Sequence, residues 1–246
     1  MENNMDKKFA VLIDADNVSG KYIKPILDEL SNEGTVTYKR IYGDWTKPAL
    51  SSWKSVLLNH SITPMQQYSY TFGKNSTDSA MIIDAMDILY SGNVNGFCIV
   101  SSDSDFTRLA VRLRESGMYV IGMGEKKTPG PFISACNRFV YLEIIAKGEG
   151  SDTTYIPERE RSEHDGIELR TVKAAISAII DEVSDEDGWA SLSEVGNILL
   201  KRYPSFDVRN FGYQKLTPFV KAQGLFEIYS IPSEKGNVKV MYIRNK

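Results

Sequence analysis

Between Phe9 and Leu142, short apolar runs alternate with stretches whose apolar residues recur at helical spacing. The runs predict strands at residues 9–13, 35–41, 62–66, 97–100, 119–123 and 139–142. The intervening stretches predict helices at residues 21–30, 48–58, 78–90 and 106–115. This alternation is typical of successive βα units. It predicts an α/β domain built on a doubly wound parallel sheet.

The segment KGEGSDTTYIPERERSEHDG, residues 147–166, lacks this periodicity and is rich in Gly, Ser, Thr and charged residues. Such a composition predicts a flexible linker between a first domain at 1–146 and a second at 167–246. In the second part, helical periodicity returns at residues 169–183, 191–204 and 211–224, followed by strand-like runs at 225–231 and 238–244. Three helices and a β-hairpin predict a smaller winged helix-turn-helix domain of the α+β class.

Composition supports two folded parts without identifying a binding surface. Of the 246 residues, 42% are hydrophobic, which is enough to form cores in both parts. The net charge is only -3, so we expect no polybasic tail or strongly steering surface, although so small a mean can hide local patches of either sign. The linker is the acidic exception, because residues 148–165 contain 2 basic and 6 acidic residues.

The cysteine content and the lengths of the apolar runs indicate where in the cell the protein is expected. Cys98 lies in an apolar run and Cys136 in a predicted helix, so no disulfide framework is indicated and a reducing compartment is expected. The N-terminal segment lacks the apolar core of a signal peptide, and no apolar run approaches the roughly 20 residues needed to span a bilayer. We therefore expect a soluble cytoplasmic protein that does not associate with membranes.

Pairs of carboxylates follow two of the predicted strands. Asp14 and Asp16 come directly after the first strand, and Asp103 and Asp105 come directly after the fourth. Each pair by itself is also explained by a turn and a helix cap, with Ser102 or Asp103 as the cap. In a doubly wound sheet, however, ligands bind at the carboxyl ends of strands near the reversal of strand order.

If the first and fourth strands are neighbours, these four carboxylates converge. Like charges at short range repel each other and raise one another's pKa values. A divalent cation removes that conflict, and ligands that are all oxygen atoms favour Mg²⁺ or Mn²⁺. The sequence therefore predicts a metal site at this edge of the sheet.

A further candidate stands at the start of the helix at 78–90. Thr77 and Asp78 are explained as helix caps, but Asp78 is also placed to supply another metal ligand. Lys74, four residues earlier, is suited to contact a phosphate. Asp84 lies among apolar residues on the same helix and is a weaker candidate.

Other kinds of catalytic site lack the residues that they need. The chain has only two histidines, His60 and His164, which argues against a histidine base, a His-rich zinc site and a Ser-His-Asp triad. Neither cysteine has a visible activating histidine. No GxGxxG or GxxxxGK[ST] motif follows the first strand, which argues against dinucleotide or nucleoside triphosphate binding. The kind of catalytic site that the sequence still allows is one in which carboxylates bind a metal ion.

Five motifs in order resemble the NYN family of PIN-like nucleases. They are IDADN (13–17), RIYGDW (40–45), GKNSTDSAMIIDAMDILY (73–90), IVSSDSDFTRLAVRLRESG (99–117) and GEKKTP (124–129). The resemblance extends over residues 8–142 and implies a PIN-like fold and metal-dependent hydrolysis of RNA phosphodiester bonds.

By motif position, the same resemblance implies the roles of individual residues. The acidic cluster that binds Mg²⁺ or Mn²⁺ would consist of Asp14, Asp78, Asp103 and Asp105. Residues suited to orienting these ligands or contacting phosphate would be Asn17, Thr77 and Ser102. Asp16 matches a position at which the family tolerates variation.

Residues 167–246, with YPSFDVRNFGYQKLTPFVKA at their centre, resemble the OST-HTH or LOTUS domain. The resemblance implies binding of RNA, which we expect to be single-stranded, and leaves a protein partner as an alternative. The candidate RNA-binding residues are Arg202, Arg209, Tyr213, Lys215 and Lys221. Phe206 and Phe211 are further candidates for base stacking, although Phe211 and Phe219 have the spacing of core residues.

The sequence thus predicts a ribonuclease that depends on Mg²⁺ or Mn²⁺, with two alternatives open. One is a non-catalytic RNA-binding or regulatory protein. The other is a phosphatase of the haloacid dehalogenase type, because DADN resembles the beginning of its DxDx[TV] motif, whose first Asp is a nucleophile. Against the phosphatase, Asn17 stands where Thr or Val is expected, and SSDSDF fits the NYN pattern better.

Overall fold

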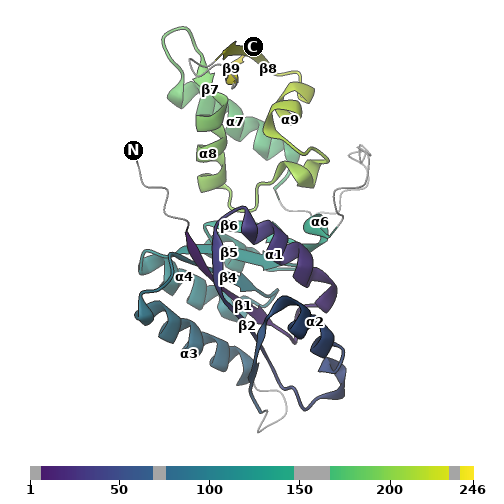
Figure 1. The fold of residues 1–246 in the computed structure, drawn as a ribbon. Helices are drawn as coiled ribbons and strands as arrows, with labels where there is room; N and C mark the ends of the chain where they lie inside the picture. Colours follow the sequence, from purple (N-terminus) through teal and green to yellow (C-terminus); the bar gives the residue numbers. More distant parts are fainter. Residues whose placement is uncertain (1–6, 69–75, 147–166, 233–238) are drawn as a thin grey trace. The chain divides into compact units, whose positions relative to one another are not determined.

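The computed structural model describes residues 7–68, 76–146, 167–232 and 239–246 (Figure 1). The chain forms two compact units, Met1–Glu149 and Gly150–Lys246. The predicted linker at 147–166 lies outside the described residues, so the domain boundaries stay a prediction. Within the described ranges, every helix is too short or too polar to cross a bilayer.

The first unit is built on a six-stranded parallel sheet with the strand order β3-β2-β1-β4-β5-β6. The strands are β1 (Lys8–Asp14), β2 (Thr35–Gly43), β3 (Thr63–Gln66), β4 (Gly96–Val100), β5 (Tyr119–Gly124) and β6 (Arg138–Tyr141). β1 pairs with β4 although β2 and β3 lie between them in the sequence, and the strand order reverses between these two strands. The predicted PIN-like, doubly wound α/β fold is confirmed.

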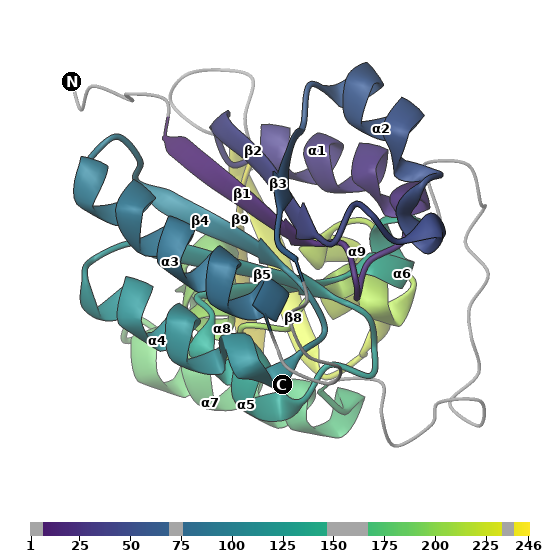
Figure 2. The same ribbon diagram turned by 90° about the horizontal axis from the view of Figure 1, so that it is seen from below.

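Helices cover both faces of this sheet (Figure 2). They are α1 (Ile23–Ser31), α2 (Trp53–His60), α3 (Ser76–Ser91), α4 (Thr107–Glu115), α5 (Gly130–Ala135) and α6 (Leu142–Ile145). Alternate β1 residues face opposite layers: Phe9, Val11 and Ile13 pack with α1 and α2, whereas Ala10 and Leu12 pack with α3, α4 and α5. Burial on both faces explains why β1 is a continuous apolar run rather than an alternating one.

The elements that differ from the prediction are short. The helix α5 has only six residues, of which Phe132 and Ala135 are buried, so it lacks the repeated apolar spacing that identifies longer helices. Cys136, predicted within a helix, instead follows α5 as its C-terminal cap residue. Three of the predicted helices begin with a 3₁₀ turn, at Gly20–Tyr22, Pro48–Leu50 and Ser104–Phe106. The last of these turns contains Asp105, so an acidic segment lies at the start of α4.

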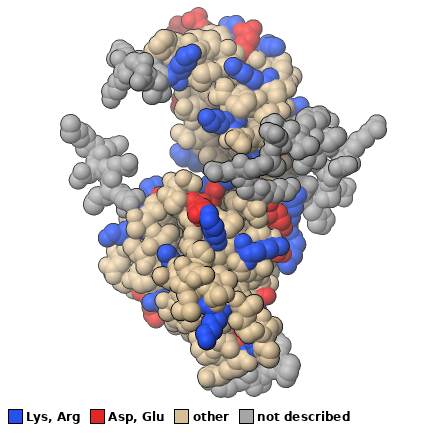
Figure 3. Space-filling model, turned by 45° about the vertical axis from the view of Figure 1, so that its right-hand side comes forward, with Lys and Arg blue, Asp and Glu red and all other residues tan. Residues whose placement is uncertain are grey.

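The surface carries charges of both signs. On the face drawn in Figure 3, Lys and Arg side chains are interspersed with Asp and Glu side chains. This agrees with the net charge of -3 for the whole chain. Binding contacts therefore have to be sought in individual side chains rather than in one large basic field on that face.

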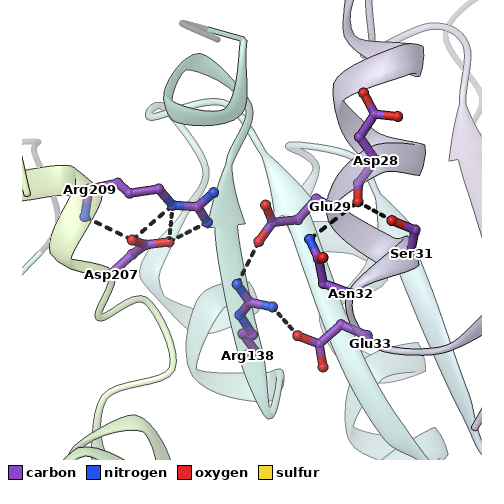
Figure 4. A network of polar contacts seen from close by, with 8 residues as sticks. All are labelled: Asp28, Glu29, Ser31, Asn32, Glu33, Arg138, Asp207 and Arg209. Carbon is purple, nitrogen blue, oxygen red and sulfur yellow. Dashed lines mark hydrogen bonds and ion pairs between the residues drawn. The ribbon is translucent and has the colours of Figure 1, made fainter. Parts of the chain in front are cut away.

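An arginine on the edge strand β6 ties this strand to α1 (Figure 4). The guanidinium of Arg138 pairs with the carboxylate of Glu29 at 2.6 Å, and its other terminal nitrogen pairs with Glu33. The side chains of Arg138 and Glu29 are only 21% and 10% exposed. Because charges removed from water need partners, these pairs keep α1 in one position against the sheet edge.

The second unit combines three helices with a three-stranded antiparallel sheet of order β7-β9-β8. Its elements are α7 (Leu169–Val183), β7 (Ala190–Ser191), α8 (Leu192–Arg202), α9 (Leu216–Ala222), β8 (Phe226–Pro232) and β9 (Lys239–Asn245). The predicted helices and hairpin are present, and the short strand β7 is an addition. The third helix starts later than predicted because Gly212, with φ of 82°, ends a separate 3₁₀ turn.

Close approach of β1, β4 and β5 requires a glycine at position 96. A Cβ atom there would lie 2.5 Å from the Tyr119 carbonyl oxygen and 2.5 Å from a ring carbon of Phe9. We expect Gly96→Ala to lower the free energy of unfolding by about 2 kcal/mol, because the carbonyl belongs to the neighbouring strand. Urea denaturation measures the change.

Gly130→Ala is the matched control for this variant. A Cβ atom at Gly130 would meet nothing within 4 Å. Its stability should therefore stay within about 0.5 kcal/mol of the unmodified protein. Equal stabilities of the two variants would contradict the close packing at Gly96.

Candidate active site

The last residue of β1, Asp14, is fully buried with 0% exposure. Its Oδ2 accepts hydrogen bonds from Asn17 Nδ2 at 2.7 Å and from Ser101 Oγ at 2.8 Å. Its Oδ1 accepts from the backbone N–H of Asp16 at 3.0 Å. Burial raises the pKa of Asp14, while the hydrogen bonds from Asn17 and Ser101 oppose that rise. Ser101 directly follows β4, so this carboxylate links the ends of the two central strands.

The turn after β4 holds the second pair of acids. The hydroxyl of Ser101, which donates to Asp14, also accepts from the backbone N–H of Asp103 at 3.1 Å. Asp103 in turn caps the 3₁₀ turn, since its Oδ1 accepts from the backbone N–H of Asp105 at 2.9 Å. Of the two predicted caps, Asp103 is the one used. The Ser102 hydroxyl accepts instead from the backbone N–H of Glu125 at 2.9 Å.

The first turn of α3 supplies the third contribution. Thr77 is buried, and its hydroxyl donates to Asp16 Oδ2 at 3.1 Å, which ties α3 to the loop after β1. Next to it, Asp78 is half-buried. One carboxylate oxygen from each of Asp78, Asp103 and Asp105 lies within 4.8 Å of the other two.

This convergence changes the chemistry of Asp78. Burial is the largest cause that raises its pKa to about 6, and the negative charges of Asp14, Asp103, Asp105 and Asp16 raise it further. Asp78 therefore gives up its proton less readily than an isolated carboxyl group. The repulsion is the expected property of carboxylates grouped without a counter-ion.

The donor set fits a divalent metal ion. Asp78, Asp103 and Asp105 offer only oxygen ligands, which suit Mg²⁺ and Mn²⁺ better than zinc. A cation among them would neutralise the mutual repulsion of the three carboxylates. Asp14 lies close enough for its charge to raise the pKa of Asp78, but its oxygens are occupied by three hydrogen bonds. Its role as a metal ligand stays a prediction.

The weaker candidate Asp84 does not join this cluster. The Asp84 carboxylate instead pairs with Arg40 and accepts a hydrogen bond from the Tyr42 hydroxyl, both on β2. Burial, followed by the contact with Asp84, raises the pKa of Tyr42. Asp84 therefore attaches α3 to the sheet. Lys74 lies outside the described residues.

Sequence reasoning missed two residues of the site. Ser101 was overlooked because Ser102 matched the motif position, yet Ser101 is the residue that bonds Asp14 and Asp103. Lys47 has its Nζ 3.7 Å from Asp16 Oδ1. The sequence did contain a signal for Lys47. This residue follows β2, which is parallel to β1, so it lies at the same carboxyl edge of the sheet as Asp14 and Asp16.

The arginines and aromatic rings predicted to bind RNA in the second unit have partners within that unit. Arg202 Nη1 donates to Glu182 Oε1 at 3.1 Å. Arg209 Nε donates to Asp207 Oδ2 at 2.9 Å, as Figure 4 shows. The rings of Phe206, Phe211 and Tyr213 pack with Phe219, at centroid distances of 6.0, 5.2 and 5.5 Å. Phe206 and Phe219 belong to the buried core, and the partly buried rings of Phe211 and Tyr213 pack against it, so the stacking of bases on these two rings stays a prediction. Lys215 and Lys221 are exposed at the two ends of α9.

Comparisons with known proteins agree with the motifs. The NYN domain family model matches residues 8–143, and the OST-HTH/LOTUS domain model matches residues 167–238. Both resemblances are therefore confirmed. No curated protein matches the chain.

Among solved structures, the chain is similar to a protein of unknown function from Vibrio parahaemolyticus. The identity is 20%, with 57% of this chain and 96% of that chain covered and a TM-score of 0.48. It is also similar to an uncharacterized protein from Nitrosomonas europaea, with 32% identity, 40% and 91% coverage, respectively, and a TM-score of 0.28.

The raised pKa of Asp78 predicts how stability depends on pH in the absence of metal. The folded pKa of about 6 exceeds the ordinary value of 3.8, so ionisation destabilises the fold progressively between these pH values and fully above pH 6. Asp78→Asn should stabilise the EDTA-treated protein above pH 6 by about 1 kcal/mol, a figure reduced for solvent screening at a half-buried group. Below about pH 4 the gain should vanish. Denaturation with urea across this pH range measures it.

Asp87→Asn provides the control, because Asp87 is an exposed carboxylate on the same helix. Its effect should stay within about 0.5 kcal/mol at every pH. A stability gain from Asp78→Asn that did not change with pH would contradict the proposed cause.

Proposed function

This chain belongs to the NYN family of PIN-like nuclease domains, and on that premise we propose that it is a ribonuclease dependent on Mg²⁺ or Mn²⁺. The OST-HTH/LOTUS match supports RNA as the ligand of the second unit. The observation that carries the proposal is the convergence of Asp78, Asp103 and Asp105 at the carboxyl edge of the central strands. The reaction is hydrolysis of an RNA phosphodiester bond, leaving a 3′-hydroxyl and a 5′-phosphate.

In this proposal, Asp78, Asp103 and Asp105 hold the metal, and Asp14 completes the acidic cluster. With Mg²⁺ or Mn²⁺ held there, the pKa of the attacking water would be lowered and the charge on the phosphate and the leaving oxygen would be neutralised. Ser101 fixes Asp14 and the backbone of Asp103 with one hydroxyl, so that the acids keep their spacing.

Supporting residues orient the cluster and the substrate. Asn17 donates a hydrogen bond to Asp14, and Thr77 donates one to Asp16. We assign Lys47 to the substrate phosphate, because an ammonium group 3.7 Å from Asp16 retains further N–H donors at the site edge. The corresponding role of Lys74 stays a prediction.

The second unit is proposed to bind single-stranded RNA and deliver it to the nuclease. Lys215 and Lys221 are the better candidates, since Arg202 and Arg209 are held by Glu182 and Asp207. A protein partner for this unit is the alternative. The buried free thiols of Cys98 and Cys136 support a reducing compartment, and we propose the cytoplasm.

The phosphatase alternative conflicts with the surroundings of Asp14. In that alternative the first Asp of DADN attacks the phosphate and forms an aspartyl-phosphate. Asp14, however, is 0% exposed and accepts hydrogen bonds from Asn17 and Ser101 on the oxygen Oδ2. A nucleophile needs access to its substrate, so this site favours the nuclease.

Asp103→Asn tests the nuclease proposal directly. The asparagine oxygen retains the cap on the Asp105 N–H but removes one negative charge from the cluster. We expect RNA cleavage to fall about a hundredfold or more, since the metal site loses a charged ligand. End-labelled single-stranded and structured RNAs, incubated with Mg²⁺, Mn²⁺ or EDTA, provide the measurement.

Asp87→Asn should retain full cleavage and is the matched control. Cleavage that persists in EDTA or in Asp103→Asn would contradict the metal site. RNA binding without cleavage by the unmodified protein would favour the non-catalytic alternative, and phosphate release from small esters would favour the phosphatase.

The double variant Lys215→Ala/Lys221→Ala tests RNA binding by the second unit. We expect the affinity for single-stranded RNA to fall about tenfold and the slope of log affinity against log salt to fall by about 1. Fluorescence anisotropy at several salt concentrations measures both quantities.

The matched control is Arg170→Ala/Lys201→Ala. It removes two exposed cations from the same unit, so its net charge equals that of the Lys215→Ala/Lys221→Ala variant. It should bind RNA nearly as well as the unmodified chain. Equal losses in the two double variants would show that only overall charge matters and would contradict a specific role for α9.

A further inference from the structure

Two large apolar side chains stand in solvent on the outer surface of α3. Ile83 is 64% exposed and Tyr90 is 74% exposed, although most large apolar side chains of this unit are buried. They are seven residues apart, or about two helical turns, and therefore lie on one face of the helix. An exposed tyrosine with a polar partner is typical of interaction surfaces.

The polar partner of Tyr90 comes from the neighbouring helix. Arg112 Nη2 on α4 donates a hydrogen bond to the Tyr90 hydroxyl at 3.3 Å. Both ribbon views show α3 and α4 side by side on the same face of the sheet (Figures 1 and 2). Arg108 is exposed one turn earlier on the same face of α4. A guanidinium has five N–H donors, and Tyr90 takes one from Arg112.

This surface continues from the acidic cluster. Asp105 precedes Arg108 by three residues and Arg112 by seven, so that all three lie on one side of the helical segment. At 1.5 Å per residue, Arg112 lies about 10 Å along the segment from Asp105. On α3, Tyr90 lies about 18 Å along the helix from Asp78. The two helices therefore carry an exposed path that leads away from the cluster.

The charges along this path differ between the two helices. On α3, the exposed Asp87 lies three residues before Tyr90 and four after Ile83 and adjoins both, whereas the Tyr90 hydroxyl accepts its hydrogen bond from Arg112 on the α4 side. Glu115 lies beyond Arg112 at the end of α4. Arg108 and Arg112 are thus the charged groups of α4 between the acidic cluster and Tyr90.

We propose that Tyr90, Arg112 and Arg108 form a second RNA contact, remote from the acidic cluster, which binds single-stranded RNA flanking the cleaved phosphodiester. The proposal rests on the proposed function. The Tyr90 ring stacks on a base, while the two guanidinium groups contact phosphates. The combination of an exposed ring, two arginines and continuity with the acidic cluster favours RNA over a protein partner.

A remote contact makes binding depend on the length of the RNA. An RNA that covers only the acidic cluster does not reach Tyr90, whereas a longer strand engages both places at once. The second contact then acts within the same complex and raises the affinity without any change at the cluster. Turnover of a bound RNA remains unchanged, because Tyr90 lies far from Asp78.

The test uses the full chain carrying Asp103→Asn, so that RNA is not degraded during binding. Fluorescence anisotropy compares labelled single-stranded RNAs of about 4 and about 16 nucleotides. Adding Tyr90→Ala and Arg112→Ala should weaken binding of the longer RNA about tenfold and leave binding of the shorter RNA within about twofold. Tyr90→Phe, which keeps the ring, should bind both RNAs within about twofold of the parent.

Lys54→Ala/Leu58→Ala is the matched control, because it removes an exposed cation and a side chain that is 73% exposed from α2. It should not alter either affinity. Unchanged binding of the longer RNA by the Tyr90→Ala/Arg112→Ala variant would overturn the second contact, as would an equal loss in the control. Thermal denaturation of each variant verifies that it is folded.

Cleavage kinetics separate this inference from the proposed function. In the chain with an intact Asp103, Tyr90→Ala/Arg112→Ala should raise KM for the longer RNA about tenfold and leave kcat unchanged. An unchanged KM with normal cleavage would refute the second contact alone. If the chain with an intact Asp103 cleaved no RNA but its affinity for the longer RNA still depended on Tyr90, the nuclease proposal would be refuted and the second contact would be supported.

Discussion

The hydrogen bond between Ser101 and the buried carboxylate of Asp14 is the constraint on which the site depends. A carboxylate removed from water is strongly unfavourable unless hydrogen bonds satisfy its oxygens. Ser101 satisfies one oxygen of Asp14 and, through the same hydroxyl, fixes the backbone of Asp103. The ends of β1 and β4 are thereby joined, and the turn that carries Asp103 and Asp105 has one defined position.

The grouping of acids shows a conflict between stability and chemistry. One carboxylate oxygen from each of Asp78, Asp103 and Asp105 lies within 4.8 Å of the other two, and burial, followed by repulsion from the neighbouring carboxylates, raises the pKa of Asp78. A chain optimised only for stability would disperse these charges, whereas a site that binds a cation needs them together. The surrounding structure maintains the grouping through a helix cap, a buried threonine and the hydrogen bonds to Asp14.

The sequence was most informative where the signal is local. The continuous apolar run at residues 9–13 predicted a strand of a doubly wound sheet. The acids that follow the first and fourth strands predicted a site on the condition that these two strands are neighbours, which they are. Pairings between distant residues were not predictable. The bond from Ser101 to Asp14 spans 87 residues, and that from Arg40 to Asp84 spans 44. The contact between the rings of Tyr213 and Phe219 likewise depends on the tertiary fold.

The adjacency of β1 and β4 also affects when the site comes into being. Between these strands the chain must complete β2, β3 and α3, so the central pairing is a contact of large sequence separation, which forms slowly. Asp14, Asp78 and Asp103 are far apart in any chain that has not made that pairing. A nascent or partly unfolded chain therefore has no assembled acidic cluster, and the fold itself restricts the cluster to finished molecules.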